Sequence, residues 1–157
     1  MRKTIGIITI FSMVVGGCFA PIGKCVDISK VFANSKYENS EEVAEIVVSG
    51  DTEKIMNYQF SNYSHLKKVI IEEGVNAIDS YAFLNCTNLE SIEIPDSVER
   101  ISSSAFKNCS SLKNVEFGNG IKEIAVGTFS DCTKLEKIEI PDNVELICSE
   151  AFKIVLP

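Results

Sequence analysis

The sequence contains little of what metal and catalytic sites usually need. Only one of its 157 residues is a histidine, His65, and it has no obvious serine or cysteine partner. A single histidine matches no zinc-ligand spacing, and a nucleophile with a base also needs a third group to orient the base. We therefore expect no enzyme, no metal site and no cofactor, and we place His65 on a surface or turn.

Basic residues are also scarce. The chain carries 15 lysines and arginines against 22 aspartates and glutamates, for a formal net charge of −7. Removing residues 1–33 takes away four basic side chains and only one acidic one, so the remainder is more acidic still. An acidic surface disfavours nucleic acid and anionic membranes as partners, and neither is expected here.

The run at 5–15 is apolar and directly follows Arg2 and Lys3. A positive segment followed by an apolar core of this length is typical of a secretory signal and is too short to span a membrane. The alternative is an uncleaved anchor over 5–22, a stretch without charge, although two glycines and a proline inside it argue against this interpretation. We expect export, and hence an extracellular or cell-surface location.

Two cleavage sites fit this signal. Residues 31–33, Val-Phe-Ala, place a small residue directly before a cut at Asn34. Residues 18–20, Cys-Phe-Ala, also end in a small residue, but the proline that follows is an unfavourable first residue after cleavage. Cys18 also ends a run that resembles a lipobox, in which it would be lipid-modified and would tether the protein to the envelope. The other interpretation is that Cys18 is a small apolar residue of the signal. We predict a signal peptide at 1–33 and a polar linker at 34–42.

The rest of the chain repeats itself every 23 residues without insertion. Clear copies begin at Leu66, Leu89, Leu112 and Leu135, and a fainter copy begins at Val43. A fixed period of this length is the signature of stacked coils, because one such unit cannot bury its own apolar face. The sequence therefore predicts a single elongated solenoid of five 23-residue coils over 43–157.

Each copy places apolar residues at the same offsets. In the copy that begins at Leu89, the alternation predicts a short strand at 91–94, a turn at Pro95-Asp96-Ser97 and a second extended segment at 98–101. A helical or irregular turn should follow. In coil 43–65 the segment 43–48 is either a strand or a short helix capped by Asn39 and Glu42, and its in-frame apolar residues favour the strand. Stacking predicts one column of rings: Phe60, Phe83, Phe106, Phe129 and Phe152.

Two further ladders of equivalent residues accompany this column. Cys86, Cys109 and Cys132 share a position that is otherwise Tyr or Val, which indicates buried free thiols rather than disulfides. Cys148 lies elsewhere in the repeat and should be partly exposed. Asn62, Asn85 and Asn108 spell glycosylation sequons, but a side chain that bonds the turn backbone explains their recurrence without a glycan, which would need a eukaryotic source.

The pattern L-x-x-I-x-I-P-D-x-V-x-x-I-x-x-x-A-F-x-N-C resembles the BspA-like, Treponema-type leucine-rich repeat of secreted and surface proteins in bacteria and some protists. The resemblance covers 43–157 and implies a leucine-rich-repeat solenoid of the α/β class, with mostly short parallel strands and helical or irregular turns. The last copy departs from the pattern at 153–157, which indicates either a C-terminal cap or a chain that stops before its natural end.

A line of glutamates runs along the exposed face of the first strands. Glu93, Glu116 and Glu139 share one position, with Lys68 and Lys137 two residues earlier in their copies. Paired carboxylates also suit glycoside hydrolysis or a cation site, but a solvated face is the simpler interpretation. The predicted binding face comprises Lys68, Ile70, Ser91, Glu93, Asn114, Glu116, Lys137 and Glu139.

The family resemblance implies a non-catalytic protein that binds extracellular or host-surface proteins, in adhesion or host interaction. A second hypothesis is a structural spacer, or a fragment of a larger surface protein, with no ligand of its own. An enzyme that uses the glutamates is the third and weakest hypothesis. The fold alone does not identify a ligand.

Overall fold

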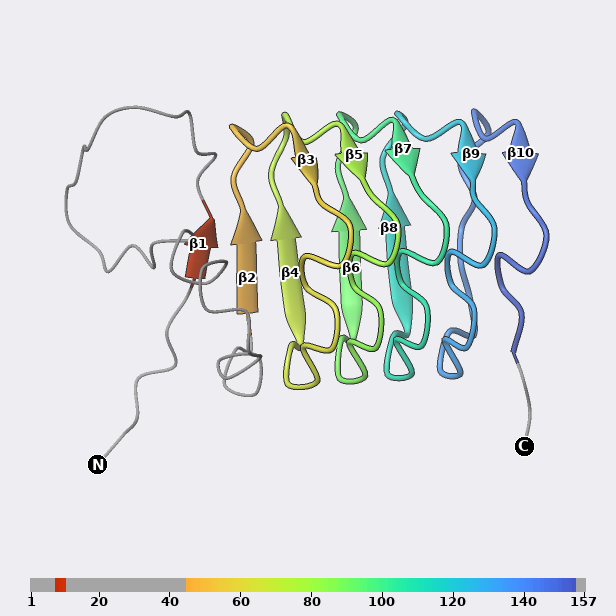
Figure 1. Cartoon of the computed structure of the whole chain (residues 1–157). Coiled ribbons are helices and arrows are strands. Elements are labelled where there is room, and N and C mark those ends of the chain that lie inside the picture. The colour runs from red at the N-terminus through yellow and green to blue at the C-terminus, as the bar shows by residue number, and fades with distance from the viewer. Residues whose placement is uncertain (1–7, 11–44, 155–157) are drawn as a thin grey trace, which may run out of the picture.

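The solenoid that the 23-residue period predicts is confirmed. The computed structural model describes residues 8–10 and 45–154, where the chain winds through successive coils that carry two parallel sheets (Figure 1). Paired residues in neighbouring strands are 23 positions apart, as in Ser91 with Asn114. We number the coils in chain order: coil 1 is 43–65, coil 2 is 66–88, coil 3 is 89–111, coil 4 is 112–134 and coil 5 is 135–157.

The longer strands form sheet A, in the order β1-β2-β4-β6-β8. In β6, Ile92 and Ile94 are buried while Ser91 and Glu93 are exposed, which is the predicted alternation of a strand with one buried face. The strand at 91–94 is confirmed to the residue. Sheet A consists of β1 (Ile8–Ile10), β2 (Glu45–Val48), β4 (Lys68–Ile71), β6 (Ser91–Ile94) and β8 (Asn114–Phe117).

The second sheet, sheet B, takes a two-residue strand from each coil. The predicted segment at 98–101 is extended in its second half only, because Val98 bonds back to the Pro95 carbonyl within the turn. Sheet B consists of β3 (Lys54–Ile55), β5 (Ala77–Ile78), β7 (Arg100–Ile101), β9 (Glu123–Ile124) and β10 (Leu146–Ile147), all parallel.

The N-terminal predictions fall largely outside the described residues. Only β1 within the predicted signal peptide is described, and it pairs in parallel with β2. The signal peptide, its cleavage, the linker at 34–42 and the lipidation of Cys18 therefore stay predictions. Of the two alternatives for 43–48, β2 is a strand. Within the described ranges the coils are joined by turns rather than helices, and no helix there is long and apolar enough to cross a membrane.

The predicted column of phenylalanines forms the centre of the core. Neighbouring rings from Phe60 to Phe152 lie 5.1–5.6 Å apart between centroids, and from Phe83 onwards their planes agree within 4°. Phe83 and Phe106 are fully buried, with a ring above and a ring below. Each coil thus completes the interior of its neighbours, as the period required.

The cysteine ladder is confirmed as a set of buried free thiols. Burial raises the pKa of Cys86 to about 12 and raises the pKa of Cys109 well above its ordinary value. Each thiol donates to a main-chain carbonyl of the preceding coil, which satisfies the S–H group inside the core. The pairs are Cys86 with Phe60 at 3.1 Å, Cys109 with Phe83 at 3.3 Å and Cys132 with Phe106 at 3.2 Å.

The asparagine ladder has a different cause from the predicted one. Asn62, Asn85 and Asn108 have positive φ angles of 60–64°, a left-handed conformation that asparagine tolerates better than most residues. Their amides bond each other rather than the turn backbone: Asn85 Nδ2 donates to Asn62 Oδ1 at 2.8 Å, and Asn108 Nδ2 donates to Asn85 Oδ1 at 2.9 Å. A second left-handed position recurs at Tyr58, Tyr81, Ser104, Gly127 and Glu150.

Coil 5 departs from the repeat. Residues 137–140 carry the same apolar alternation as β6 but form no strand, so sheet A ends at β8 while sheet B continues to β10 (Figure 1). Ile154 stands where the earlier coils carry Asn or Asp, and it does not adopt their left-handed conformation. A β-branched residue strongly disfavours that conformation, so the path of coil 5 changes there.

Candidate functional site

The predicted binding face lies on the outer side of sheet A. All eight of its residues are exposed, six of them at the outward positions of alternating strands. Six of them lie on β4, β6 and β8, and the structure brings these six together on one surface. Lys137 and Glu139 lie beyond β8, in the segment that forms no strand.

Two glutamates form the centre of this face. Glu93 on β6 and Glu116 on β8 are direct partners in the parallel register. Like charges placed opposite each other are unfavourable, and among residues 45–154 neither carboxylate has an ion-pair partner. This pair is therefore an uncompensated negative site on an open surface.

The two lysines of the face are neutralised within the chain. Lys68 Nζ lies 3.2 Å from Glu45 Oε1, and Lys137 Nζ lies 2.8 Å from Glu139 Oε1. The hydrogen bond between Lys137 and Glu139 lowers the pKa of the carboxyl and raises the pKa of the ammonium. Glu139 is thus paired, and the predicted line of three equivalent glutamates is reduced to Glu93 and Glu116.

Other acidic residues near this face hold the turns together. Glu73 accepts hydrogen bonds from the main-chain N–H groups of Asp96 and Ser97 at 3.1 and 3.0 Å. Asp96 in turn accepts from the Asn119 N–H at 2.7 Å. These carboxylates support the stacking of successive turns. This ladder was not among the predicted features, although the 23-residue spacing of the turn residues was a signal for it.

Two shallow hollows flank Glu116 where the strands end. One, of about 420 Å³, is lined by Glu73, Glu93, Asp96, Glu116, Phe117 and Asn119 among others. The other, of about 640 Å³, lies between β8 and the unpaired segment and includes Asn114, Glu116, Lys137, Glu139 and Asp142. Both are open and acidic, which suits contact with a cationic partner surface more than enclosure of a small molecule.

The lone histidine lies on an exposed turn, as predicted. Ser64 Oγ is 3.3 Å from His65 Nδ1, a contact between sequence neighbours that the sequence analysis did not expect. No carboxylate within 45–154 hydrogen-bonds to this imidazole, so the orienting group of a catalytic triad is missing there. Among the described residues no three or more His, Cys, Asp or Glu side chains are grouped so that they could hold a metal ion.

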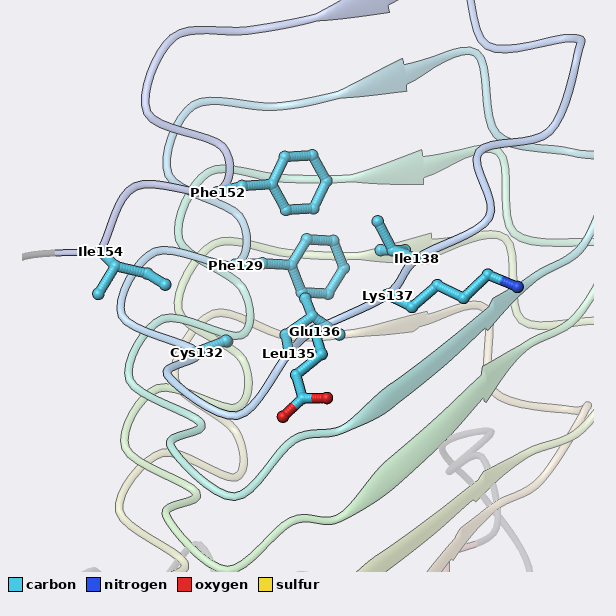
Figure 2. A pocket seen from close by; sticks show the side chains of 8 residues that line it. All are labelled: Phe129, Cys132, Leu135, Glu136, Lys137, Ile138, Phe152 and Ile154. Carbon is cyan, nitrogen blue, oxygen red and sulfur yellow. The ribbon is translucent and has the colours of Figure 1, made fainter.

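A third hollow lies between coil 4 and coil 5, and most of the residues that line it are apolar. It has a volume of about 140 Å³ and is lined by Phe129 and Cys132 of coil 4 and by Leu135, Ile138 and Ile154 of coil 5 among others. Figure 2 shows the rings of Phe129 and Phe152 one above the other beside it, with the charged ends of Glu136 and Lys137 pointing away from the rings. No feature of the repeat pattern predicted this hollow.

Cys148 is partly exposed, as predicted, and it lies in coil 5. Its Sγ is 3.0 Å from Glu123 Oε1. The hydrogen bond to this carboxylate raises the pKa of the Cys148 thiol, so the thiol is less ionised than an ordinary cysteine near neutral pH.

Solved structures of similar proteins share this architecture. A leucine-rich cell surface protein from Faecalibacterium prausnitzii is 34% identical, with a TM-score of 0.72 over 94% of this chain and 38% of that protein. A leucine-rich repeat protein from Eubacterium ventriosum is 27% identical, with a TM-score of 0.66 over 73% of this chain and 33% of its own. The pneumococcal vaccine antigen PcpA is 28% identical, with a TM-score of 0.61 over 71% and 28%.

These relatives are much longer than this chain of 157 residues, which spans 38% or less of each. No match was found among curated proteins. The model of the BspA-type leucine-rich repeat region matches residues 30–155 in six copies, which begin before coil 1. With that match over most of its length, and with the solenoid geometry described above, the chain belongs to the BspA-type leucine-rich repeat family.

Proposed function

We propose that this chain is a secreted or cell-surface, non-catalytic repeat protein whose sheet A face binds other extracellular proteins, in adhesion or host interaction. The observation that carries the proposal is the exposed pair Glu93 and Glu116, which is uncompensated within 45–154 and flanked by open hollows. Long-range attraction between such a face and a basic partner surface speeds association and selects against acidic partners.

The location rests on two supports. The first is the predicted signal peptide at 1–33, with a lipid anchor on Cys18 as its alternative. The second is the 34% identity to a protein described as a leucine-rich cell surface protein. Both support a location outside the cytoplasm, where an acidic repeat surface would meet matrix and cell-surface proteins.

The test compares two charge reversals of equal size in the full chain. Glu93→Lys with Glu116→Lys changes the proposed site, while Glu99→Lys with Glu145→Lys makes the same change at exposed positions outside sheet A. Binding to a panel of purified extracellular-matrix proteins is measured by surface plasmon resonance at low and physiological salt. We expect the first variant to lose about tenfold in affinity and the second to bind like the wild type.

The structural-spacer hypothesis makes the opposite prediction. It is favoured by the fact that the chain spans 38% of a longer cell-surface relative, so the repeats could hold another module away from the envelope. In that case neither variant changes the affinity for any matrix protein, and equal losses in both variants would also remove Glu93 and Glu116 from the site.

A further inference from the structure

The outer face of sheet A carries one row of side chains that changes character halfway along. Val47 on β2 and Ile70 on β4 are register partners, and Glu93 on β6 and Glu116 on β8 are register partners in the next two coils. These strands are neighbours in the sheet, so the four residues follow one another across it in steps of 23 positions (Figure 1). We call this line the face row. Its first half is apolar and its second half is acidic.

The parallel row two residues earlier in each strand carries no net charge. Beside the apolar half, Lys68 Nζ lies 3.2 Å from Glu45 Oε1 and the two charges compensate each other. Beside the acidic half, the equivalent residues are Ser91 and Asn114, which are uncharged register partners. The contrast between the two halves is therefore set by the face row itself. An isoleucine that is 36% exposed is followed by two carboxylates without an ion-pair partner among residues 45–154.

The hollow of about 420 Å³ lies beside the acidic half of the face row. It is lined by Glu93 and Glu116 together with Pro95 and Gly118, which have a short side chain or none. At the same position of coil 2, Glu72 instead accepts a hydrogen bond from the Gly50 N–H at 3.1 Å. A long basic side chain that approaches the face therefore has room to lie beside both free carboxylates.

The spacing of the face row selects the backbone of a partner. Neighbouring strands are about 4.8 Å apart, so the later members of the row lie about 4.8, 9.6 and 14.4 Å from the first. A helix rises about 1.5 Å per residue, and its positions i+3, i+7 and i+10 lie on the same face as i, about 4.5, 10.5 and 15 Å along the axis. Same-face residues of an extended strand are about 6.8 Å apart and lose this register at once. A helix along the row matches every step to within about 1 Å.

We infer that the partner lays a single amphipathic helix along the face row, with two apolar residues over Val47 and Ile70 and two lysines or arginines over Glu93 and Glu116. The apolar pair covers the exposed isoleucine, and the basic pair neutralises two carboxylates that repel each other in the free chain. Apolar and basic residues at i, i+3, i+7 and i+10 thus define the partner segment. The inference rests on the proposed function, because it assigns a partner to the same face.

The probe is a synthetic, alanine-rich helical peptide of about 20 residues, with leucines at i and i+3 and lysines at i+7 and i+10. The control peptide exchanges the residues at i+3 and i+7, which keeps the composition and net charge but alternates leucine and lysine. Binding to the full chain is measured by fluorescence anisotropy. We expect the probe to bind at least about tenfold more tightly than the control. Equal affinities overturn the inference.

A third peptide tests the helix itself. It carries the probe sequence with a proline at its centre, which breaks the helix but keeps the order of leucines and lysines. We expect this peptide to bind no better than the alternating control, because its side chains no longer keep the spacing of the face row. A proline peptide that binds as tightly as the probe overturns the helical partner and indicates an extended one.

Two variants of the chain test the apolar half of the row. Ile70→Glu extends the acidic half by one coil, so it should weaken the probe about tenfold and favour a peptide with one leucine and three lysines. Val126→Glu makes the same charge change at a side chain that is 44% exposed outside sheet A, and it should bind both peptides like the wild type. If Ile70→Glu binds the probe as tightly as the wild type does, only total charge matters and the inference is overturned.

Failure of the helix inference differs from failure of the proposed function. If the probe and the alternating control bind equally while Glu93→Lys with Glu116→Lys still loses matrix binding, the proposed function stands and the helical partner is overturned. If the probe binds selectively but that double variant keeps its affinity for every matrix protein, the face accepts such a helix and the proposed role in matrix binding is overturned.

Discussion

Coil 3 and coil 5 have closely similar sequences, but they differ in what covers them. Ile101 in coil 3 is 1% exposed, whereas Ile147, its equivalent in coil 5, is 49% exposed. Coil 3 forms strands in both sheets, but coil 5 forms only β10. The repeat sequence therefore specifies which side chains point inward, while a neighbour on each side decides whether they are buried.

The side-chain ladders show the same difference. Phe106 is stacked between two rings, but among the described residues Phe152 is stacked on one side only. The left-handed Asn position of coils 1 to 3 is occupied by Ile154 in coil 5. Within the described residues coil 5 thus lacks two of the ladder contacts of the inner coils, which is consistent with the unpaired segment 137–140.

The largest expected effect comes from cutting the ring column. Phe106→Ala should lower the free energy of unfolding by about 3–5 kcal/mol, because it removes a fully buried ring with neighbours on both sides. Phe152→Ala should cost less than about half of that, since its ring is partly exposed. Urea denaturation followed by circular dichroism measures both. Equal losses would show that coil 5 is packed as firmly as coil 3.

The second prediction uses alkaline pH. The buried Cys86 thiol has its pKa raised to about 12 in the folded chain, so the unfolded chain loses this proton first. Its stabilising contribution is complete below the ordinary thiol pKa and is lost as the pH rises towards 12. This contribution falls by up to about 1.4 kcal/mol per pH unit.

The matched variants are Cys86→Val and Cys148→Ala. Their free energy of unfolding is measured by urea denaturation between pH 8 and pH 11, a range that begins near the ordinary thiol pKa of about 8.5. Cys86→Val should show a shallower loss of stability with pH than the wild type. Cys148→Ala should flatten the slope less, because this thiol is only partly buried and its pKa is raised chiefly by the exposed hydrogen bond to Glu123. A slope that Cys86→Val leaves unchanged would contradict the assignment.

The third prediction concerns the asparagine ladder. Asn85→Ala should cost about 2 kcal/mol, because alanine is strained at a φ of 60° and cannot replace the amide bonds to Asn62 and Asn108. Asn85→Gly relieves the strain but still lacks the bonds, so it should cost about half as much. Thermal and urea unfolding of the two variants separates these contributions. Equal costs would mean that backbone strain plays no part.

Much of the fold could be predicted from the sequence because the period fixes contacts between residues that are far apart. The strand at 91–94, the column of phenylalanines and the burial of Cys86 all follow from aligning the copies. The left-handed positions were not predicted, since Tyr81 and Ser104 are not residues that indicate such a conformation. The open edge at 137–140 was missed because the local pattern there is that of a strand.

The site was predictable to a similar degree. Alternation alone places Ser91, Glu93 and Glu116 on the exposed face. The sequence does not show which charged residues lack an ion-pair partner, because ion pairs depend on the conformations of long side chains. The pairing of Lys68 with Glu45 was within reach, since the two occupy the same position of adjacent coils and are register partners.

The smallest expected changes in stability come from breaking the ion pairs of Asp79 and Glu139. Asp79 in coil 2 lies 3.4 Å from Lys54 Nζ and 3.3 Å from Arg100, so it links three coils, and its side chain is only 15% exposed. Asp79→Asn should therefore lower the free energy of unfolding by about 0.5–1 kcal/mol. Glu139→Gln breaks a fully exposed pair in the loose segment and should give no measurable change.

Urea denaturation at low and high salt distinguishes the two variants. The loss in Asp79→Asn should shrink as salt screens the partly exposed lysine and arginine in the wild type, whereas Glu139→Gln should match the wild type at both salt levels. A measurable cost at Glu139 would show that residues 137–140 are held in place by their own charges. Coil 5 would then resemble the inner coils in rigidity and differ from them only in burial.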